Sequence, residues 1–293
     1  MSVSSGTSLV LRAPAKVNLS LRIIGRRQDG YHDLDTVMQK LDLCDLITLT
    51  VTDEPGIVLQ CPDSDLQEDR SNIVFRAAEV FFAVGACGEL GVRITLEKNI
   101  PVAAGLGGGS SDAGTVLVGL NRLFGAGLST ADLIVLARPL GADVSFFVTD
   151  FGAVRAKGIG DQMSVVPSLK DCTLVLVNPG FPVSTRWVYE KYALTMADKD
   201  SRLRDSQKKI SHVLPDVGNN DLEQITLSSY PEVGCLRQSL LGLGASLVLM
   251  SGSGPTVFGI FANEDGGVST LVGQAVHALE QQNGVKVFVT QPV

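Results

Sequence analysis

The sequence predicts an α+β protein, because strand and helix patterns follow one another without the regular alternation of βαβ units. Alternating apolar and polar residues indicate the strands, and apolar residues three or four positions apart indicate the helices. The 293 residues, 45% of them hydrophobic, suffice for two packed domains or one large one. A turn region and Pro167 precede a new strand, so we expect domains of residues 1–163 and 164–293.

Most elements follow from these periodicities. From Lys16 to Ile23 the alternation is unbroken, which predicts a strand with one polar face. Further strands are expected at residues 46–51, 92–96, 174–177, 246–250 and 256–261, and helices at 72–84, 113–124 and 268–279. We expect Pro55 to Arg70 to be a polar connection, and Ala197 to His212 to be a mobile insertion or an exposed helix.

The composition argues against several classes of protein. Acidic residues outnumber basic ones by 31 to 24, and a net charge of -7 is not that of a nucleic-acid-binding surface. No apolar run approaches the roughly 18 residues of a membrane span, and no secretion signal is visible. Five scattered cysteines predict reduced thiols without zinc or disulfides. We therefore expect a cytoplasmic protein that binds neither nucleic acid nor membranes.

A glycine-rich segment from Gly105 to Ala113, Gly-Leu-Gly-Gly-Gly-Ser-Ser-Asp-Ala, lies between a predicted strand and a predicted helix. Glycines allow the backbone to approach an oxyanion closely. Ser110 or Ser111 is expected to cap the helix, whose free N–H groups and positive dipole end would face the ligand. The segment therefore predicts a cradle for phosphate.

Two common nucleotide loops do not fit this segment. A Walker A loop requires Gly-Lys-Ser/Thr where this chain has Ser-Ser-Asp, and a dinucleotide fingerprint requires glycine in place of Ser110. A flexible turn without a ligand remains the alternative. It would not need four glycines, which cost conformational entropy on folding.

Phosphoryl transfer requires a phosphate site, a cation, a metal and an aligned acceptor hydroxyl. Lys16 lies beside Asn18 on the polar strand face, although on its own it fits a surface lysine better. Asp143 is a single carboxylate among apolar residues, so it is either paired or functional. On its own it fits a structural role as well as a catalytic one.

Three motifs together carry a resemblance that covers essentially the whole chain. Residues 13–19, 105–113 and 251–255 resemble, in order and spacing, the three motifs of the GHMP small-molecule kinases. Asp29-Gly30-Tyr31-His32, the segment 140–144 and the segment from Val183 to Tyr189 resemble the branch of that family that acts on a cytidine diphosphate-linked alcohol.

The resemblance implies a two-domain GHMP kinase fold with ATP on the glycine loop and the active site in the cleft between the domains. It implies ATP-dependent phosphorylation of the 2-hydroxyl of 4-diphosphocytidyl-2-C-methyl-D-erythritol, in non-mevalonate isoprenoid biosynthesis. Mg²⁺ is expected to bridge the ATP phosphates. The metal ligands and the oligomeric state stay open.

The same resemblance implies roles for individual residues. Lys16 and Asp143 match the catalytic pair of the family. The implied nucleotide-binding residues are Asn72, Lys98, Pro101, Gly105, Leu106, Gly107, Gly108, Gly109, Ser110 and Ser111. The implied substrate-binding residues are Asn18, Tyr31, His32, Thr185 and Tyr189. Tyr31 and Tyr189 are expected to stack on the cytosine, and His32 to hydrogen-bond its edge.

Two positions depart from the family pattern: Ser145 stands where proline is common, and Asp161 where glutamate is frequent. Two other functions remain in view. Another GHMP kinase would act on an alcohol without a base, which Tyr31, His32 and Tyr189 argue against. A catalytically silent nucleotide or metabolite sensor would not need Lys16 and Asp143.

Overall fold

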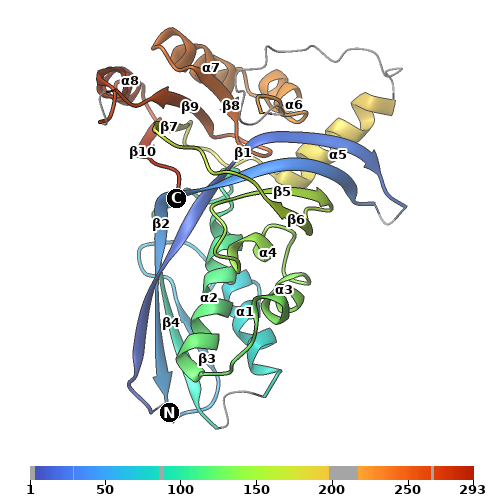
Figure 1. Ribbon diagram of the computed structural model, residues 1–293, viewed down its shortest axis with the longest axis vertical. Helices are drawn as coiled ribbons and strands as arrows, with labels where there is room; N and C mark the ends of the chain where they lie inside the picture. The colour runs from blue at the N-terminus through green and yellow to red at the C-terminus, as the bar shows by residue number, and fades with distance from the viewer. Residues whose placement is uncertain (1–3, 29, 86–88, 198–216, 265–266) are drawn as a thin grey trace. The chain divides into compact units, whose positions relative to one another are not determined.

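The computed structural model describes residues 4–28, 30–85, 89–197, 217–264 and 267–293 (Figure 1). Its helices and strands follow one another irregularly, as expected of an α+β protein. Two compact units are present. Unit 1 comprises residues 1–15, 44–100 and 107–151, and unit 2 comprises residues 16–43, 101–106 and 152–293. The segment expected to be an insertion, Ala197 to His212, lies outside the described residues except for Ala197, the last residue of a helix.

This grouping differs from a single division between residues 163 and 164. The long strands β1 (Ser8–Arg26) and β2 (His32–Thr52), which pair with each other, each contribute residues to both units (Figure 1). The strand β6 (Gln162–Val165) spans the expected boundary and pairs with β5 (Ala153–Gly158). Sequence periodicity identified parts of β1 and β2 but did not show that both strands contribute to both units.

Unit 1 consists of a small sheet and four helices. The second half of β2 pairs antiparallel with β4 (Gly91–Glu97), and β4 pairs parallel with β3 (Ile57–Gln60). The helices are α1 (Ile73–Phe82), α2 (Gly108–Phe124), α3 (Thr130–Ala137) and α4 (Val144–Phe147). Their apolar faces and alternate residues of β2 and β4 form one core. The connection expected from Pro55 to Arg70 thus contains a strand, in which Ile57 and Leu59 face the core.

The first part of unit 2 contains the N-terminal half of β2, which pairs antiparallel with β5. Three polar residues of β1 in this unit, Lys16, Asn18 and Ser20, are buried, whereas Arg22 is exposed. The alternation that predicted a strand with one polar face is correct. Thr36 of β2 bonds to the side chain of Asn18, and a Cβ on Gly252 would lie 3.3 Å from Asn18 Oδ1 and 3.6 Å from Lys16 Nζ, so other parts of unit 2 cover this end of the polar face.

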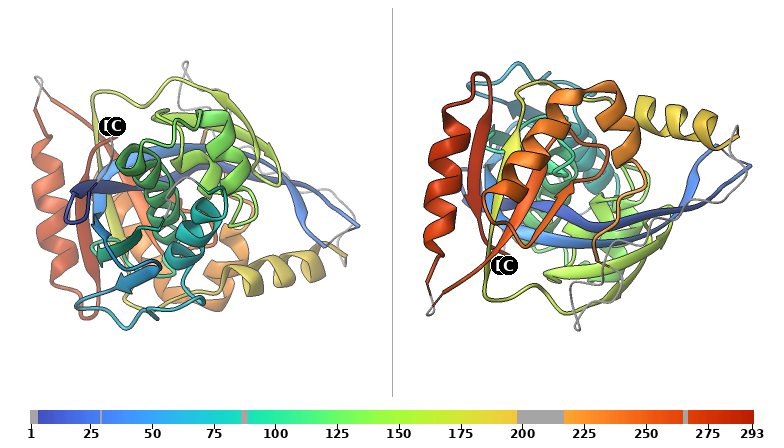
Figure 2. Two further views of the ribbon diagram at one scale, coloured as in Figure 1. Left: turned by 90° about the horizontal axis from the view of Figure 1, so that it is seen from below. Right: turned by 90° about the horizontal axis from the view of Figure 1, so that it is seen from above.

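The second part of unit 2 is an antiparallel sheet in the order β10-β7-β9-β8. Its strands are β7 (Cys172–Asn178), β8 (Leu247–Met250), β9 (Val257–Ala262) and β10 (Lys286–Thr290). The helices α7 (Pro231–Gly242) and α8 (Thr270–Glu280) share a core with the sheet (Figure 2), and α5 (Thr185–Ala197) and α6 (Glu223–Ser229) complete the unit. A Cβ on Gly259 would lie 3.2 Å from Leu240 Cδ2, so glycine allows α7 to pack closely on β9.

A pair of glycine-to-alanine changes tests how tightly α2 and α4 pack. A Cβ on Gly114 in α2 would lie 2.7 Å from Phe147 Cβ, so Gly114→Ala should lower the free energy of unfolding by about 1–3 kcal/mol. Gly273 in α8 has no neighbouring atom within 4 Å of such a Cβ, so Gly273→Ala should raise it by up to about 1 kcal/mol. Denaturant unfolding measures both, and equal effects would contradict the packing argument.

Candidate active site

The glycine segment is a sharp loop that opens α2. Gly105 and Gly107 have φ values of 79° and 71°, a region that favours glycine. Gly107 is the N-cap of α2, and the helix begins at Gly108. The expectation that Ser110 or Ser111 caps the helix is therefore wrong, because the left-handed turn at Gly107 starts the helix earlier and places both serines inside its first turn. The hydroxyl of Ser111 is buried and has no hydrogen-bond partner within the described structure.

Within unit 2 the three sequence motifs meet through backbone groups. The Ser251 hydroxyl donates to the Gly105 carbonyl at 2.9 Å and accepts from the Asn18 N–H at 3.3 Å. The Lys16 N–H donates to the Leu106 carbonyl at 2.9 Å. One serine thus connects all three motifs, which lie far apart in the sequence, and the loop has little freedom to change its path.

The side chains of the first motif form a buried polar chain. Lys16, 4% exposed, donates from Nζ to Asn18 Oδ1. Asn18 Nδ2 donates to the Thr36 hydroxyl at 2.8 Å, and that hydroxyl donates to the Ser20 carbonyl at 2.6 Å. Lys16 is therefore not a surface lysine. This series of hydrogen bonds orients the Asn18 amide so that its oxygen faces the Lys16 ammonium group.

Asp143 lies in unit 1, immediately before α4, and its side chain is partly buried. The close packing of α4 on Gly114 sets the position of the helix, since the Val144 carbonyl and Phe147 both lie against that glycine. Ser145, at the position where proline is common, is buried, and its hydroxyl has no hydrogen-bond partner in the described part of the chain.

The residues expected to recognise the base all belong to unit 2. The rings of His32 and Tyr189 lie 5.3 Å apart between centroids, at 31°. Burial, and then the charge of Arg26, lower the pKa of His32, so at neutral pH its imidazole has one donor and one acceptor nitrogen. Tyr31 is 63% exposed. Thr185 bonds through its hydroxyl to Ser253 of the third motif at 2.9 Å.

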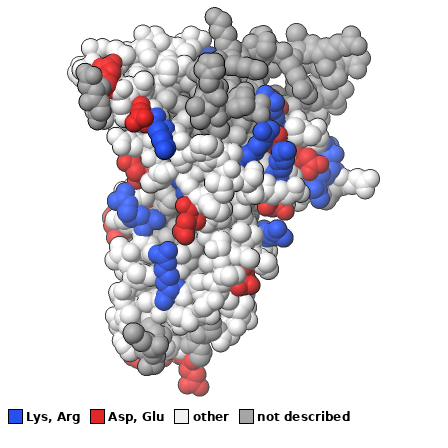
Figure 3. All heavy atoms as spheres, viewed as in Figure 1, with Lys and Arg blue, Asp and Glu red and all other residues white. Residues whose placement is uncertain are grey.

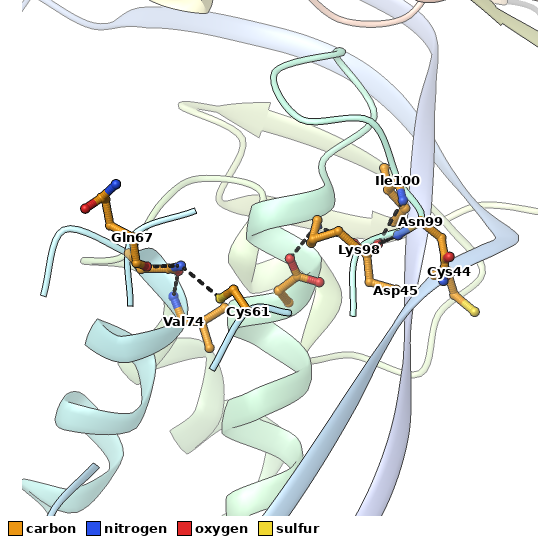
Figure 4. Close-up of polar contacts among 10 residues, drawn as sticks. Cys44, Asp45, Cys61, Gln67, Val74, Lys98, Asn99 and Ile100 are labelled. Carbon is orange, nitrogen blue, oxygen red and sulfur yellow. Dashed lines mark hydrogen bonds and ion pairs between the residues drawn. The ribbon is translucent and has the colours of Figure 1, made fainter. Parts of the chain in front are cut away.

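Asn72 and Lys98, expected near the adenosine, both have protein partners in unit 1 (Figure 4). Asn72 caps α1: its Oδ1 accepts from the Val74 N–H at 3.0 Å, and its Nδ2 donates to the Gln67 carbonyl at 2.9 Å. The Lys98 ammonium donates to Asp45 and, at 2.7 Å, to Asp112.

Burial shifts the pKa values of this ion-pair cluster. Burial raises the pKa of Asp112 to about 7, Lys98 opposes the rise and Asp45 adds to it. For Lys98, burial acts to lower the pKa, but Asp112 and Asp45 outweigh it, so that the pKa rises and the lysine stays charged. Asp112 is therefore the group whose charge changes near neutral pH.

Sequence reasoning missed Asp45, Thr36 and the side chain of Asp112. A signal existed for Asp45: it is in phase with Ile47 and Leu49, the buried positions of β2, where a carboxylate needs a partner. Asp112 was part of the glycine motif, but the motif alone does not reveal its contact with a lysine 14 residues earlier.

Charges of both signs are interspersed on the face in Figure 3. None of the helices described is both long enough and apolar enough to cross a membrane. Likewise, no group of three or more His, Cys, Asp or Glu side chains among the described residues could hold a metal ion.

Comparison with known proteins gives the family. The model of the GHMP kinases N terminal domain matches residues 72–150, and that of the GHMP kinases C terminal matches residues 208–268. These segments lie on either side of the boundary expected near residue 163. The protein thus belongs to the class of small-molecule kinases with the GHMP fold.

Relatives narrow the class. The chain is 46% identical over 289 residues to the 4-diphosphocytidyl-2-C-methyl-D-erythritol kinase of Desulfotalea psychrophila, covering 98% of this chain and 96% of that one. It is 47% identical over 259 residues to the protein of that name from Geobacter metallireducens, covering 88% and 91%. A crystal structure of 4-(cytidine 5'-diphospho)-2C-methyl-D-erythritol kinase matches with a TM-score of 0.75 and 34% identity, covering 96% and 99%.

A homoserine kinase from Cytophaga hutchinsonii matches with a TM-score of 0.71 at 18% identity, covering 100% of this chain and 96% of that one, which shows a common fold alone. The chain belongs to the GHMP kinase family and, within it, to the 4-diphosphocytidyl-2-C-methyl-D-erythritol kinases. It is accordingly an enzyme that transfers a phosphoryl group to a small molecule.

The contact of the loop with the third motif can be tested at Gly105. A Cβ there would lie 2.1 Å from the Ser251 carbonyl oxygen. Gly105→Ala should therefore lower the free energy of unfolding by roughly 1–2 kcal/mol for the left-handed backbone conformation and by about a further 1–3 kcal/mol for the clash. Gly127 has a similar φ of 68° with open space around it, so Gly127→Ala should lower the free energy of unfolding only by the part due to the left-handed conformation. Denaturant unfolding compares the two, and equal losses would contradict the close approach.

Proposed function

We propose that the protein transfers the γ-phosphoryl group of ATP to the 2-hydroxyl of 4-diphosphocytidyl-2-C-methyl-D-erythritol, a step of non-mevalonate isoprenoid biosynthesis. The observation that carries the proposal is the 46% identity, over 98% of the chain, to a relative named for this substrate.

ATP fits the loop that opens α2. The loop turns into the helix at Gly107 in a left-handed conformation, and the N-terminus of a 17-residue helix favours anions. We propose Pro101, the residues from Gly105 to Ser111, and the neighbouring Asn72 and Lys98 as the nucleotide site. Since the side chains of Asn72 and Lys98 already have protein partners, we expect them to shape the site as much as contact the nucleotide.

Mg²⁺ fits the same proposal, because it commonly takes one or two carboxylates and completes its shell with phosphate oxygens and water. It would arrive with ATP and neutralise phosphate charge. A cage of three or more protein ligands, which the described residues do not offer, is not required.

Asp143 and Lys16 are the proposed catalytic residues. The ordinary pKa of an aspartate, about 3.9, is far below that of an alcohol, so Asp143 cannot remove the proton before transfer. We expect it to orient the acceptor hydroxyl and to accept the proton late. Lys16, oriented by Asn18, stabilises developing negative charge.

Tyr31, His32, Thr185 and Tyr189 are the proposed contacts of the cytidine part, together with Asn18 on the acceptor side. In the structure Tyr189 packs on His32, while Tyr31 is largely exposed. A neutral His32 can both donate to and accept from a cytosine edge.

The function is tested by incubating the protein with ATP, Mg²⁺ and 4-diphosphocytidyl-2-C-methyl-D-erythritol, and following the products by phosphorus NMR. A new phosphomonoester and ADP are expected. Mevalonate and homoserine serve as acceptors without a base. Turnover of either in preference to the cytidyl compound would assign the protein to another GHMP kinase activity, and no turnover of any acceptor would favour a silent sensor.

Asp143→Asn should bind ATP and the cytidyl substrate nearly as the wild type does, yet lose most turnover. The amide keeps the shape of the carboxylate but cannot accept the proton. Calorimetry measures binding and single-turnover kinetics measures the chemical step, with Asp150→Asn at an exposed position as the matched control. Turnover within about threefold of wild type, a barrier change below roughly 1 kcal/mol, would make Asp143 structural.

Tyr189→Ala should weaken binding of the cytidyl substrate by about 1–3 kcal/mol and leave ATP affinity unchanged, because base stacking on an aromatic ring is worth that much. A site that hydrogen-bonds the base should also prefer cytosine to uracil, since the exchange at C4 leaves a buried partner unpaired. The measure is kcat/KM for the cytidyl substrate and its uridyl analogue. Indifference to both changes would refute the assignment of the base site.

A further inference from the structure

A buried cluster in unit 1 lies beneath the start of the phosphate loop. It consists of Asp45 on β2, Lys98 one residue beyond β4, and Asp112, the fifth residue of α2, and we call it the Lys98 clamp. All three side chains are at least nine-tenths buried, and that of Asp45 is 0% exposed. Buried charges without a specific task are rare, which makes the cluster informative.

The clamp holds both ends of the loop. Asp45 Oδ1 accepts from the N–H groups of Asn99 and Ile100, at 2.6 and 2.8 Å, immediately before the loop begins at Pro101 (Figure 4). Asp112 lies on α2, the helix that follows the loop, five residues after the N-cap Gly107. The Lys98 ammonium bonds to both carboxylates and therefore joins the two ends.

We propose that the Lys98 clamp positions the phosphate loop and that its net charge governs how strongly the loop binds the ATP phosphates. This inference rests on the proposed function only in taking ATP as the ligand of the loop. Asp45, Lys98 and Asp112 act as positioning residues and need not touch the nucleotide.

Proximity supports the electrostatic part of the proposal. A Cβ on Gly108, the first residue of α2, would lie 3.3 Å from Lys98 Nζ. The ammonium group at the centre of the clamp thus lies beside the first residue of α2, where the proposed phosphate site begins. Inside a protein, screening by water is weak at this range, so one unit of charge changes anion affinity by on the order of tenfold.

The clamp contains two carboxyl groups and one ammonium group. Asp112 uses only Oδ2 for Lys98, and its buried Oδ1 has no hydrogen-bond partner in the described chain. A carboxylate with an unpaired buried oxygen is costly in the ionised state. With Asp112 protonated the clamp is neutral, and with Asp112 ionised it carries one negative charge.

The surroundings of Asp112 agree with this account. Burial raises its pKa to about 7, with Lys98 opposing the rise and Asp45 adding to it. Burial also raises the pKa of the nearby Cys61 thiol, with Glu68 and Asp112 adding to the rise, so that the thiol stays neutral. Other charged groups on the elements packed against α2 are Arg76 and Glu79 on α1, Asp132 on α3 and Asp143 before α4.

The sign of the effect follows. Above pH 7 the ionised clamp opposes the phosphates, so ATP binds more weakly. Binding of ATP then favours protonation of Asp112, and proton uptake accompanies binding. In the free protein, the folded state keeps a proton on Asp112 that the unfolded chain releases near pH 4. The contribution of Asp112 to the free energy of unfolding therefore falls as the pH rises from 4 to 7.

The experiment measures ATP binding by calorimetry from pH 6 to pH 8.5 at saturating Mg²⁺, in pairs of buffers that differ in ionisation enthalpy. Wild type should lose on the order of tenfold more affinity across this range than Asp112→Asn, and should take up more protons near pH 7.5. The amide can still accept from Lys98 but cannot ionise. Protonation of ATP itself affects both measurements equally, so it does not contribute to the difference between the two proteins.

Asp132→Asn is the matched control. Hydrogen bonds from Ser129 lower the pKa of Asp132, which is therefore charged throughout the range, so removing its charge should leave the pH dependence as in wild type. In the free protein, the thermal midpoint of Asp112→Asn should rise relative to wild type as the pH increases from 5 to 7.5. At saturating ATP, kcat should keep the same pH profile in both proteins.

Equal pH slopes and equal proton uptake in wild type and Asp112→Asn would overturn the proposal. If Asp112→Asn does not fold, the wild type alone decides: the proposal is overturned if the wild type takes up no more protons on binding than the protonation of ATP accounts for. Failure to bind ATP at any pH would refute the proposed function and the clamp together. A pH-dependent ATP affinity without turnover of the cytidyl compound would refute only the acceptor assignment.

Discussion

The path of the backbone from Gly105 to Gly108 is the constraint on which the rest of the site depends. Two left-handed glycines turn the chain into α2, and the carbonyls of Gly105 and Leu106 accept from Ser251 and from the backbone of Lys16. Because a Cβ at Gly105 would collide with the backbone at Ser251, the first and third motifs can approach the loop only if that residue is glycine. The same turn leaves the N–H groups of the first helical turn directed outward, where an anion can bind them.

Buried polar groups surround this loop, and each set of partners fixes a particular atom. In unit 2 the chain from Lys16 through Asn18 to Thr36 determines which way the Asn18 amide faces. In unit 1 Asp45 fixes the last two residues before the loop. Such networks stabilise a fold little compared with apolar packing of equal volume, but they define one geometry. A kinase that works by positioning and electrostatics depends more on a single, well-defined geometry of its polar groups than on added stability.

The sequence predicted the elements with clear periodicity, such as β4, β7, α1, α2 and α8, because periodicity reports the direction of side chains along a single element. Weakly periodic elements, such as β3, β6, β10 and the helices α3 to α7, were not predicted. Prediction from the sequence also failed where the outcome depends on distant segments. The strand with Lys16 was predicted, yet the side chains of Lys16, Asn18 and Ser20 are buried, since Thr36 and the distant Gly252 lie against them. The turn from the glycine segment into a helix was predicted, yet the helix starts at Gly108 without a serine cap. The division at residue 163 did not anticipate β1 and β2 running through both compact units. Lys98 was selected by resemblance alone, and its ion pairs with Asp45 and Asp112 required the pairing of β2 with β4 to be known.

Three carboxyl groups of unit 1 differ in their environment. Asp143 is partly buried at the start of a short helix, whereas Asp45 and Asp112 are enclosed and share one lysine. Asp45 accepts hydrogen bonds from an ammonium group and two backbone amides. Asp112 uses one oxygen for Lys98, while its other oxygen has no hydrogen-bond partner in the described chain, and protonation lowers the cost of burying it. An apolar residue at position 112 would avoid the cost but would leave Lys98 with a single partner and the start of α2 without its link to the end of β4. A side chain that accepts a hydrogen bond keeps this link, and an aspartate there makes the net charge of the proposed Lys98 clamp depend on pH.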